Sequence, residues 1–165
     1  MKLILKKILP PLAVGMILAA FFACASQASS EESRLPALSG FDQVERKDWK
    51  LTAVRLGGAD TGFSRDTLGS EFASSFTLRF QGGMAGGRGA PNTYRSPFEQ
   101  GADQSLSIQP AAATLMAPLW EPEGLKEHEY FGYLGRVYRW NIRDGNLELS
   151  TKGADGTEAV LVSSE

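Results

Sequence analysis

Alternating apolar and polar positions recur along the chain from residue 49 onward. The cleanest example is residues 76–80 (FTLRF), where three large apolar side chains alternate with two polar ones. Neighbouring side chains of a strand point to opposite faces, so this pattern predicts a half-buried β-strand. Similar runs separated by turn residues predict strands at 49–55, 76–80, 92–99, 106–108, 112–117, 137–142, 146–151 and 157–163.

One stretch has a helical period instead. Between residues 123 and 136, Leu125, Phe131 and Leu134 fall on one stripe, with His128 at its edge. The dipeptide Asp144-Gly145 follows, and it predicts a tight hairpin because both residue types tolerate positive φ. We therefore expect one helix, followed by a meander of three strands.

About eight short strands and a single helix predict a mainly β (α+β) domain over residues 49–165. A sheet of this size curls to hide its edges, so we expect a small open antiparallel β-barrel with the helix capping it. Gly86, Gly87 and Gly89 lie inside strand territory, where glycine allows bends and close backbone approach.

The first 23 residues have a different pattern. Three lysines precede an unbroken apolar run at 8–23, and small residues surround Cys24. This layout predicts a bacterial signal peptide over 1–23. Phe-Phe-Ala-Cys resembles a lipoprotein box, which makes Cys24 the expected lipidation site. Ordinary signal cleavage after Ala25 or Ala28 and an uncleaved membrane anchor are the alternatives.

Residues 24–48 are polar, rich in Ser and Glu, and without an apolar period. We interpret them as a flexible tether that holds the domain off a membrane. Leu35, Leu38 and Phe41 are the exceptions, and they could dock on the domain or form a short turn. The expected location is the outer membrane, facing the periplasm; a soluble periplasmic or secreted protein is the alternative.

The net charge and the scarcity of cysteine and histidine exclude several classes of function. The predicted signal peptide takes three of the 17 basic residues, which leaves 14 against 19 acidic ones. An acidic domain without a basic patch is not expected to bind nucleic acid. Cys24 is the only cysteine and His128 the only histidine, so the domain has no internal disulfide, thiolate metal site or multi-histidine site.

No motif in the domain indicates catalysis. The glycine cluster lacks the spacing and the strand–helix context of a phosphate-binding loop. His128 lacks the second histidine of a zinc-protease helix, and no Gly-x-Ser-x-Gly elbow is present. We therefore predict no catalytic, cofactor-binding or metal-binding residue, and a non-enzymatic protein.

Aromatic residues occupy most of the predicted strands, and core packing accounts for them. A barrel interior left partly open for an acyl chain or another apolar ligand is the alternative, because small barrels can hold one. Trp120 stands apart, in a Pro-flanked segment before the helix. It is the residue that we expect to be exposed, at a contact with a partner or ligand.

A set of short motifs carries a family resemblance. They are WKL from residue 49, FTLxF from 76, GRGAPNxY from 87, ATxMA from 113, Glu127 leading to Phe131 and Leu134, and LxL from 147. Their order and spacing resemble the META domain family of HslJ-like bacterial envelope lipoproteins, over residues 49–162. The signature positions, which we interpret as structural, are Trp49, Gly89, Asn92, Tyr94, Thr114, Met116, Glu127 and Leu134.

The resemblance implies an open antiparallel β-barrel with a helix, and a role in envelope stress tolerance without an established enzymatic activity. Many relatives carry one cysteine in a Gly-Cys-Asn motif and a second after Thr-x-Met. Here Ala90 or Pro91 and Pro118 fill those positions, so this chain has no such redox pair. The implied partners are the membrane, through the lipid on Cys24, and an envelope protein or an apolar ligand.

Overall fold

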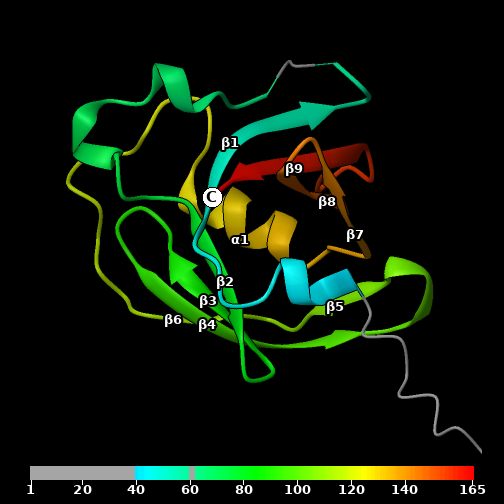
Figure 1. Cartoon of the computed structure of the whole chain (residues 1–165). Helices are drawn as coiled ribbons and strands as arrows, with labels where there is room; N and C mark the ends of the chain where they lie inside the picture. Colours follow the sequence, from blue (N-terminus) through cyan, green and yellow to red (C-terminus); the bar gives the residue numbers. More distant parts are fainter. Residues whose placement is uncertain (1–39, 60–61) are drawn as a thin grey trace, which may run out of the picture. The chain divides into compact units, whose positions relative to one another are not determined.

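The computed structural model describes residues 40–59 and 62–165, and these residues belong to one compact unit. Figure 1 shows its strands arranged as a ring around helix α1. The strands are β1 (Trp49–Leu56), β2 (Thr77–Gln81), β3 (Met84–Arg88), β4 (Thr93–Gln100), β5 (Leu106–Ile108), β6 (Ala112–Ala113), β7 (Arg139–Arg143), β8 (Asn146–Lys152) and β9 (Glu158–Ser164). The α-helix is α1 (Glu127–Leu134), and the 3₁₀ helices are η1 (Gly40–Gln43), η2 (Arg65–Thr67), η3 (Ser70–Phe72) and η4 (Ala102–Gln104).

The strands form one antiparallel sheet in the order β5-β4-β3-β2-β1-β9-β8-β7, with β6 also paired to β4. The two outer strands meet through a bridge between Ser105 and Arg139 and a hydrogen bond from Leu106 N to Tyr138 O (3.2 Å). The predicted mainly β barrel is therefore confirmed, and it is nearly closed. No helix among the described residues has the length and apolarity to cross a membrane.

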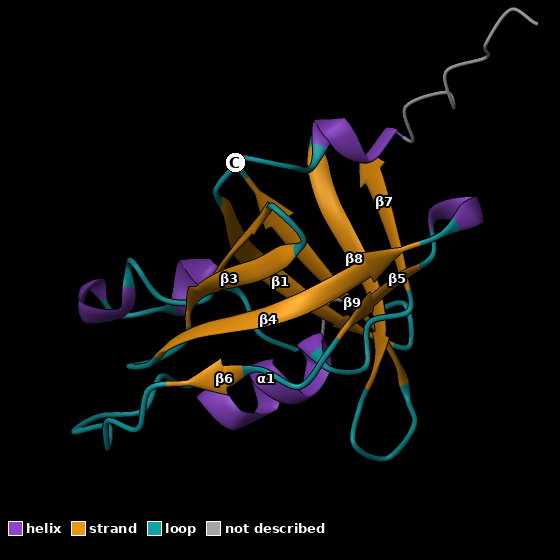
Figure 2. Cartoon of the chain, turned by 90° about the horizontal axis from the view of Figure 1, so that it is seen from below, coloured by secondary structure: helices purple, strands orange, loops and turns teal. Residues whose placement is uncertain are grey.

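Aromatic rings fill the interior in two groups. At one end, Phe41 of η1 contacts Phe80, Phe98 and Trp140, with ring centroids 5.1–5.5 Å apart. At the other end, Tyr130 of α1 lies at the centre of a group that also contains Phe63, Phe76, Tyr94 and Phe131. Figure 2 shows α1 at the lower end of the barrel and η1 at the upper end, and we call these the α1 end and the η1 end.

The strand pattern located eight of the nine strands among the described residues; β3 was missed, because its glycines hide the alternation and were expected only to bend the chain. The Asp144-Gly145 hairpin has positive φ at both residues, 52° and 78°, as predicted. Glycine is required at Gly87, where an added Cβ would lie 2.0 Å from the carbonyl oxygen of Thr77. The pattern therefore located a close approach between two backbones as well as the strands.

Three boundaries differ from the prediction. The helix is shorter than 123–136, because Gly124 has a φ of 81° and the chain turns there before α1 begins. The strand predicted at 112–117 ends at Ala113: Thr114 N still donates to Thr93 O of β4 (3.0 Å), but Met116 bonds to the side chain of Asn92 instead. The packed part of the chain begins before residue 49: Phe41 and Val44 are buried, so Phe41 docks on the domain, one of the two outcomes considered for it.

Candidate functional site

Most of the signature residues converge at the α1 end, around the connection between β3 and β4. Here Gly89 N donates to Asn92 O (2.6 Å), and the peptide bond between Ala90 and Pro91 is cis. This tight loop directs two backbone N–H groups toward the start of α1. An alternation pattern cannot show this arrangement, because it depends on the backbone and not on side-chain polarity.

Glu127, the first residue of α1, receives those N–H groups. Its Oε1 accepts from Ala90 N and Asn92 N, both at 2.7 Å, and its Oε2 accepts from Asn92 Nδ2 at 2.6 Å. A carboxylate at a helix N-terminus is also favoured by the helix dipole. Gly89 leaves room for it, since an added Cβ would lie 2.4 Å from Oε1.

Asn92 connects this cluster to the segment after β6. Its Oδ1 accepts from Thr114 Oγ1 (2.8 Å) and Met116 N (2.7 Å), and its Nδ2 also donates to Met116 O (3.1 Å). Both donors and both acceptor positions of this buried amide are therefore used. We call Gly89, Asn92, Thr114, Met116 and Glu127 the Asn92 network.

Two buried tyrosines lie beside the network. Tyr94 Oη (2.8 Å) and Tyr130 Oη (3.1 Å) both donate to the carbonyl oxygen of Thr77. Burial raises the pKa of Tyr94 well above its usual value, and the nearby Tyr130 adds to the rise. Burial likewise raises the pKa of Tyr130. Both hydroxyls therefore stay protonated at physiological pH and act as hydrogen-bond donors.

Arg65 was not singled out by the sequence. Its guanidinium donates to four backbone carbonyl groups, those of Leu51 (2.5 Å), Ala73 (3.1 Å), Ser75 (2.7 Å) and Phe76 (3.3 Å). Burial lowers the pKa of this half-buried side chain. Arg65 thereby joins η2 to β1 and to the segment that leads into β2. Its partners are backbone atoms, which every sequence has, so the sequence contained no signal for it.

These contacts make the Asn92 network structural. The carboxylate of Glu127 is occupied by three donors from the chain itself, and the side chain of Asn92 has no unused group. A general base or a ligand-binding amide needs a free position for its substrate. Among the described residues, no group of three His, Cys, Asp or Glu side chains is placed to hold a metal ion.

The network also fixes the start of the most exposed apolar segment. Leu115, Leu119 and Trp120 are 98%, 92% and 77% exposed. Met116, between them, has both backbone polar groups bonded to Asn92. The expected exposure of Trp120 is confirmed, and two leucines that the sequence analysis did not single out accompany it.

The other predicted positions are dispersed. Trp49 is buried in β1, and its Nε1 donates to Val44 O (2.9 Å). Leu134 is buried on α1, whereas His128 is exposed. Cys24 and the predicted signal peptide lie outside the described residues, so the structure does not test the lipidation site.

A META domain family model matches residues 42–165, and the chain therefore belongs to the META domain family. No curated protein matches the chain. A solved structure of a protein from Burkholderia xenovorans is similar, with a TM-score of 0.53 and 19% identity over 76% of this chain and 86% of that one. A DUF4847 family protein from Bacteroides vulgatus has a TM-score of 0.50 and 11% identity, over 77% of this chain and 98% of that one. At these identities, the likeness concerns the fold alone.

Proposed function

We propose that this chain is a non-enzymatic cell-envelope protein that acts by binding a partner protein at its surface, in envelope stress tolerance. We further propose that a lipid on Cys24 anchors it to the outer membrane, facing the periplasm. Membership of the META domain family supports the first part of the proposal, since this is not a known enzyme family.

The observation that carries the proposal is the exposed segment from Leu115 to Trp120. Single exposed apolar residues are ordinary, but a contiguous group marks an interaction surface. Residues 111–120 contain no charged side chain. Met116 is held by Asn92, and Pro118 restricts the backbone beyond it. A segment fixed in this way loses less conformational entropy on binding than a free loop.

The interior of the barrel favours surface binding over the alternative of an apolar-ligand carrier. Side chains from both ends, including Phe41, Phe76, Phe80 and Tyr130, are almost fully buried in it. The alternative makes a direct prediction: a carrier would be thermally stabilised by fatty acids or phospholipids, because a ligand that binds only the native state raises its stability. We expect no such stabilisation of the purified domain.

Photo-crosslinking tests the surface. A benzophenone amino acid at position 120 is expected to give a crosslinked product of discrete mass in cells. The same probe at Tyr138 is the matched control. Tyr138 is also an exposed aromatic residue, but it follows α1 in the chain whereas Trp120 precedes it, and it is expected to give no crosslinked product. Equal crosslinking from both positions, or none from position 120, would contradict the proposed surface.

Cell fractionation tests the anchor separately. A Cys24→Ala variant cannot be lipidated and is expected to leave the membrane fraction. Ser26→Ala, two residues away, is the matched control and is expected to stay with the membrane. If the Cys24→Ala variant still fractionates with membranes, the lipid anchor is wrong, whatever the crosslinking shows.

A further inference from the structure

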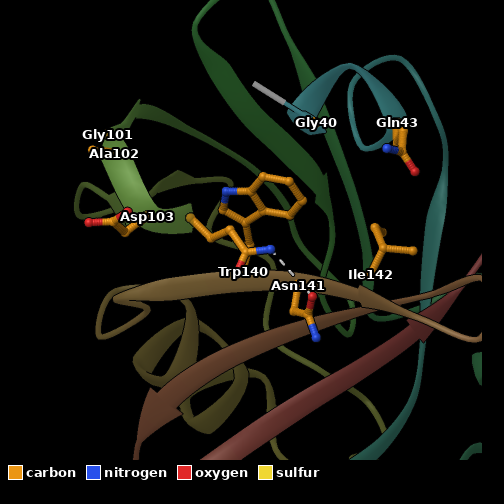
Figure 3. Close-up of a pocket in the computed structure, with 9 residues that line it drawn as sticks. Gly40, Gln43, Gly101, Ala102, Asp103, Trp140, Asn141 and Ile142 are labelled. Carbon is orange, nitrogen blue, oxygen red and sulfur yellow. Dashed lines mark hydrogen bonds between the residues drawn. The ribbon is translucent and has the colours of Figure 1, made fainter. Parts of the chain in front are cut away.

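A hollow of about 460 Å³ opens at the η1 end of the barrel. It lies between η1, the turn that contains η4, and β7, as Figure 3 shows. Its lining combines one indole ring, three carboxamides, one carboxylate and small apolar groups. The polar and aromatic members are Gln43, Asp103, Gln104, Trp140 and Asn141.

Trp140 contributes an unpaired donor to this hollow. The residue is 5% exposed, and its ring contacts Phe41, yet its indole N–H donates to no atom in the described part of the chain. All fully buried side-chain nitrogen and oxygen atoms there have hydrogen-bond partners. The indole N–H must therefore reach the surface, and the hollow is the surface that Trp140 lines. In Figure 3 the indole nitrogen lies on the side of Asp103.

The turn across the hollow has an unusual backbone. Asp103 and Gln104 have φ values of 54° and 62°, in the left-handed region that residues with a side chain seldom adopt. Hydrogen bonds from Gly101 N to Ser105 O (3.1 Å) and from Ser105 N to Ala102 O (3.0 Å) close the turn. Strained backbone of this kind gathers at binding sites.

The two strained residues differ in their partners. Gln104 is fixed by hydrogen bonds to Asn141 (3.4 Å) and Arg139 (3.2 Å). The carboxylate of Asp103, by contrast, has no hydrogen-bond or ion-pair partner among the described residues. The turn thus leaves an exposed, unpaired carboxylate at the rim of the hollow that Trp140 lines.

These groups select a ligand by its chemistry. An indole N–H only donates, so it needs an acceptor, whereas a carboxylate only accepts and needs a donor. A hydroxyl group serves both, and the amide of Gln43 can add a third contact. Asp103 is the only charged residue in the lining, so an anion is disfavoured. Several hydroxyls on a small ring with apolar C–H edges match this combination.

We propose that the hollow floored by Trp140 is a binding site for a neutral saccharide. This inference goes beyond the proposed function, because it concerns a different surface and a different class of ligand from the Leu115–Trp120 segment. It also stands independently of the lipid on Cys24.

Indole resonances in NMR spectra provide the test, because the chain has three tryptophans. The protein from residue 25 onward, which contains all the described residues, is titrated with the neutral N-acetylglucosamine dimer N,N′-diacetylchitobiose, called chitobiose below. The indole resonance of Trp140, assigned with a Trp140→Phe variant, is expected to move and to saturate at millimolar sugar. The resonances of Trp49, which bonds Val44, and of Trp120, on the distant segment, are expected to stay in place.

Three results would overturn the proposal. One is a Trp140 resonance that does not move at the highest sugar concentration. Another is an equal response to glycerol, which has hydroxyls but no ring. The third is an indole N–H of Trp140 that exchanges slowly with solvent before any sugar is added, since another part of the chain would then cover the hollow.

A matched pair of variants assigns the binding to the strained turn. Asp103 and Asp144 are both exposed carboxylates with similar φ values, 54° and 52°. Asparagine tolerates this conformation, so both Asp→Asn variants are expected to fold. Asp103→Asn is expected to raise the Kd for chitobiose about tenfold, because a hydrogen bond to a charged group is lost. Asp144→Asn is expected to leave it unchanged, and equal Kd values for the two variants would contradict the site.

Discussion

The two ends of the barrel are closed by different kinds of contact. At the η1 end, Phe41 inserts a ring among three other aromatic side chains. At the α1 end, Glu127 and Asn92 join the helix to two loops through directional hydrogen bonds. Apolar packing accepts many side chains of suitable size, whereas a saturated network needs particular residues.

This difference explains why most of the signature residues lie at the α1 end, whereas Phe41 at the η1 end belongs to no family motif. Gly89, Asn92, Thr114, Met116 and Glu127 are few and specific, so they can be found by their spacing before their contacts are known. Phe41 is one apolar residue in a polar stretch, without a period around it. Its burial follows from tertiary packing, which the local pattern does not contain.

The largest expected loss of stability comes from a substitution at the η1 end. Phe41→Ala removes a buried ring that contacts Phe80, Phe98 and Trp140. We expect a loss of about 3–5 kcal/mol in the free energy of unfolding, from lost burial and the cavity that remains. Urea unfolding measures it. Leu119→Ala, at an exposed position, is the control and should change stability by less than about 0.5 kcal/mol.

A small effect of Phe41→Ala would show that η1 only lies against a barrel that is stable without it. Residues 40–48 would then belong to the tether predicted over residues 24–48, and their contacts with the barrel would contribute little to stability. A large effect would make residues 40–48 part of the folded domain in energy as well as in position.

The second expected loss of stability, at the α1 end, is smaller and comes from particular hydrogen bonds. Glu127→Gln keeps the size of the side chain and removes its charge. The groups that bond to the Glu127 carboxylate are all donors, so the new N–H₂ group of glutamine has no acceptor there. We expect a loss of about 2–3 kcal/mol, because N–H groups of Ala90 and Asn92 lose a charged partner. Urea unfolding measures the loss, and amide hydrogen exchange at Ala90 and Asn92 locates it.

Glu123→Gln is the matched control for this variant. Glu123 is exposed and precedes α1, so its replacement is expected to change stability by less than about 0.5 kcal/mol. A double-mutant cycle of Glu127→Gln with Asn92→Ala should be strongly non-additive, since the two side chains share a hydrogen bond. Additive effects would mean that the Asn92 network does not act as one unit.

The sequence predicted the sheet and the signature residues, but not their contacts. Alternation located β2, β4, β7, β8 and β9 because each has one face in the core. It extended β6 to residue 117, where an Asn side chain replaces the neighbouring strand. A side-chain amide that bonds both backbone groups of Met116 leaves no trace in the hydrophobic pattern.

The hollow at the η1 end was missed for a similar reason. Trp140 lies in the strand predicted at 137–142, whose aromatic residues were attributed to the core, and it is buried there, but its N–H opens to the surface. The positive φ values of Asp103 and Gln104 were also not foreseen, because glycine is the residue that usually signals this conformation. The two residues lie between the strands predicted at 92–99 and 106–108, but their strain depends on how β4 and β5 meet.

The smallest expected effect is a difference between the two ends of the barrel in how stability depends on pH. Burial raises the pKa of Tyr94 and Tyr130 at the α1 end above the usual value of 10.0. The unfolded chain loses these protons near pH 10, whereas the folded chain keeps them to higher pH. The stabilisation is therefore complete below pH 10 and is lost as the pH rises above it. Tyr130→Phe removes one of the two groups, so its stability should fall less steeply between about pH 9 and 11. At neutral pH, Tyr130→Phe should cost about 1 kcal/mol, for the loss of one hydrogen bond to Thr77.

Urea unfolding between about pH 9 and 11 measures both effects of Tyr130→Phe, with Phe41→Ala as the comparison. That variant changes no titrating group, so it should lower stability equally at every pH. If Phe41→Ala and Tyr130→Phe show the same alkaline slope, the tyrosine hydroxyls do not distinguish the two ends, and the α1 end is held by packing as the η1 end is.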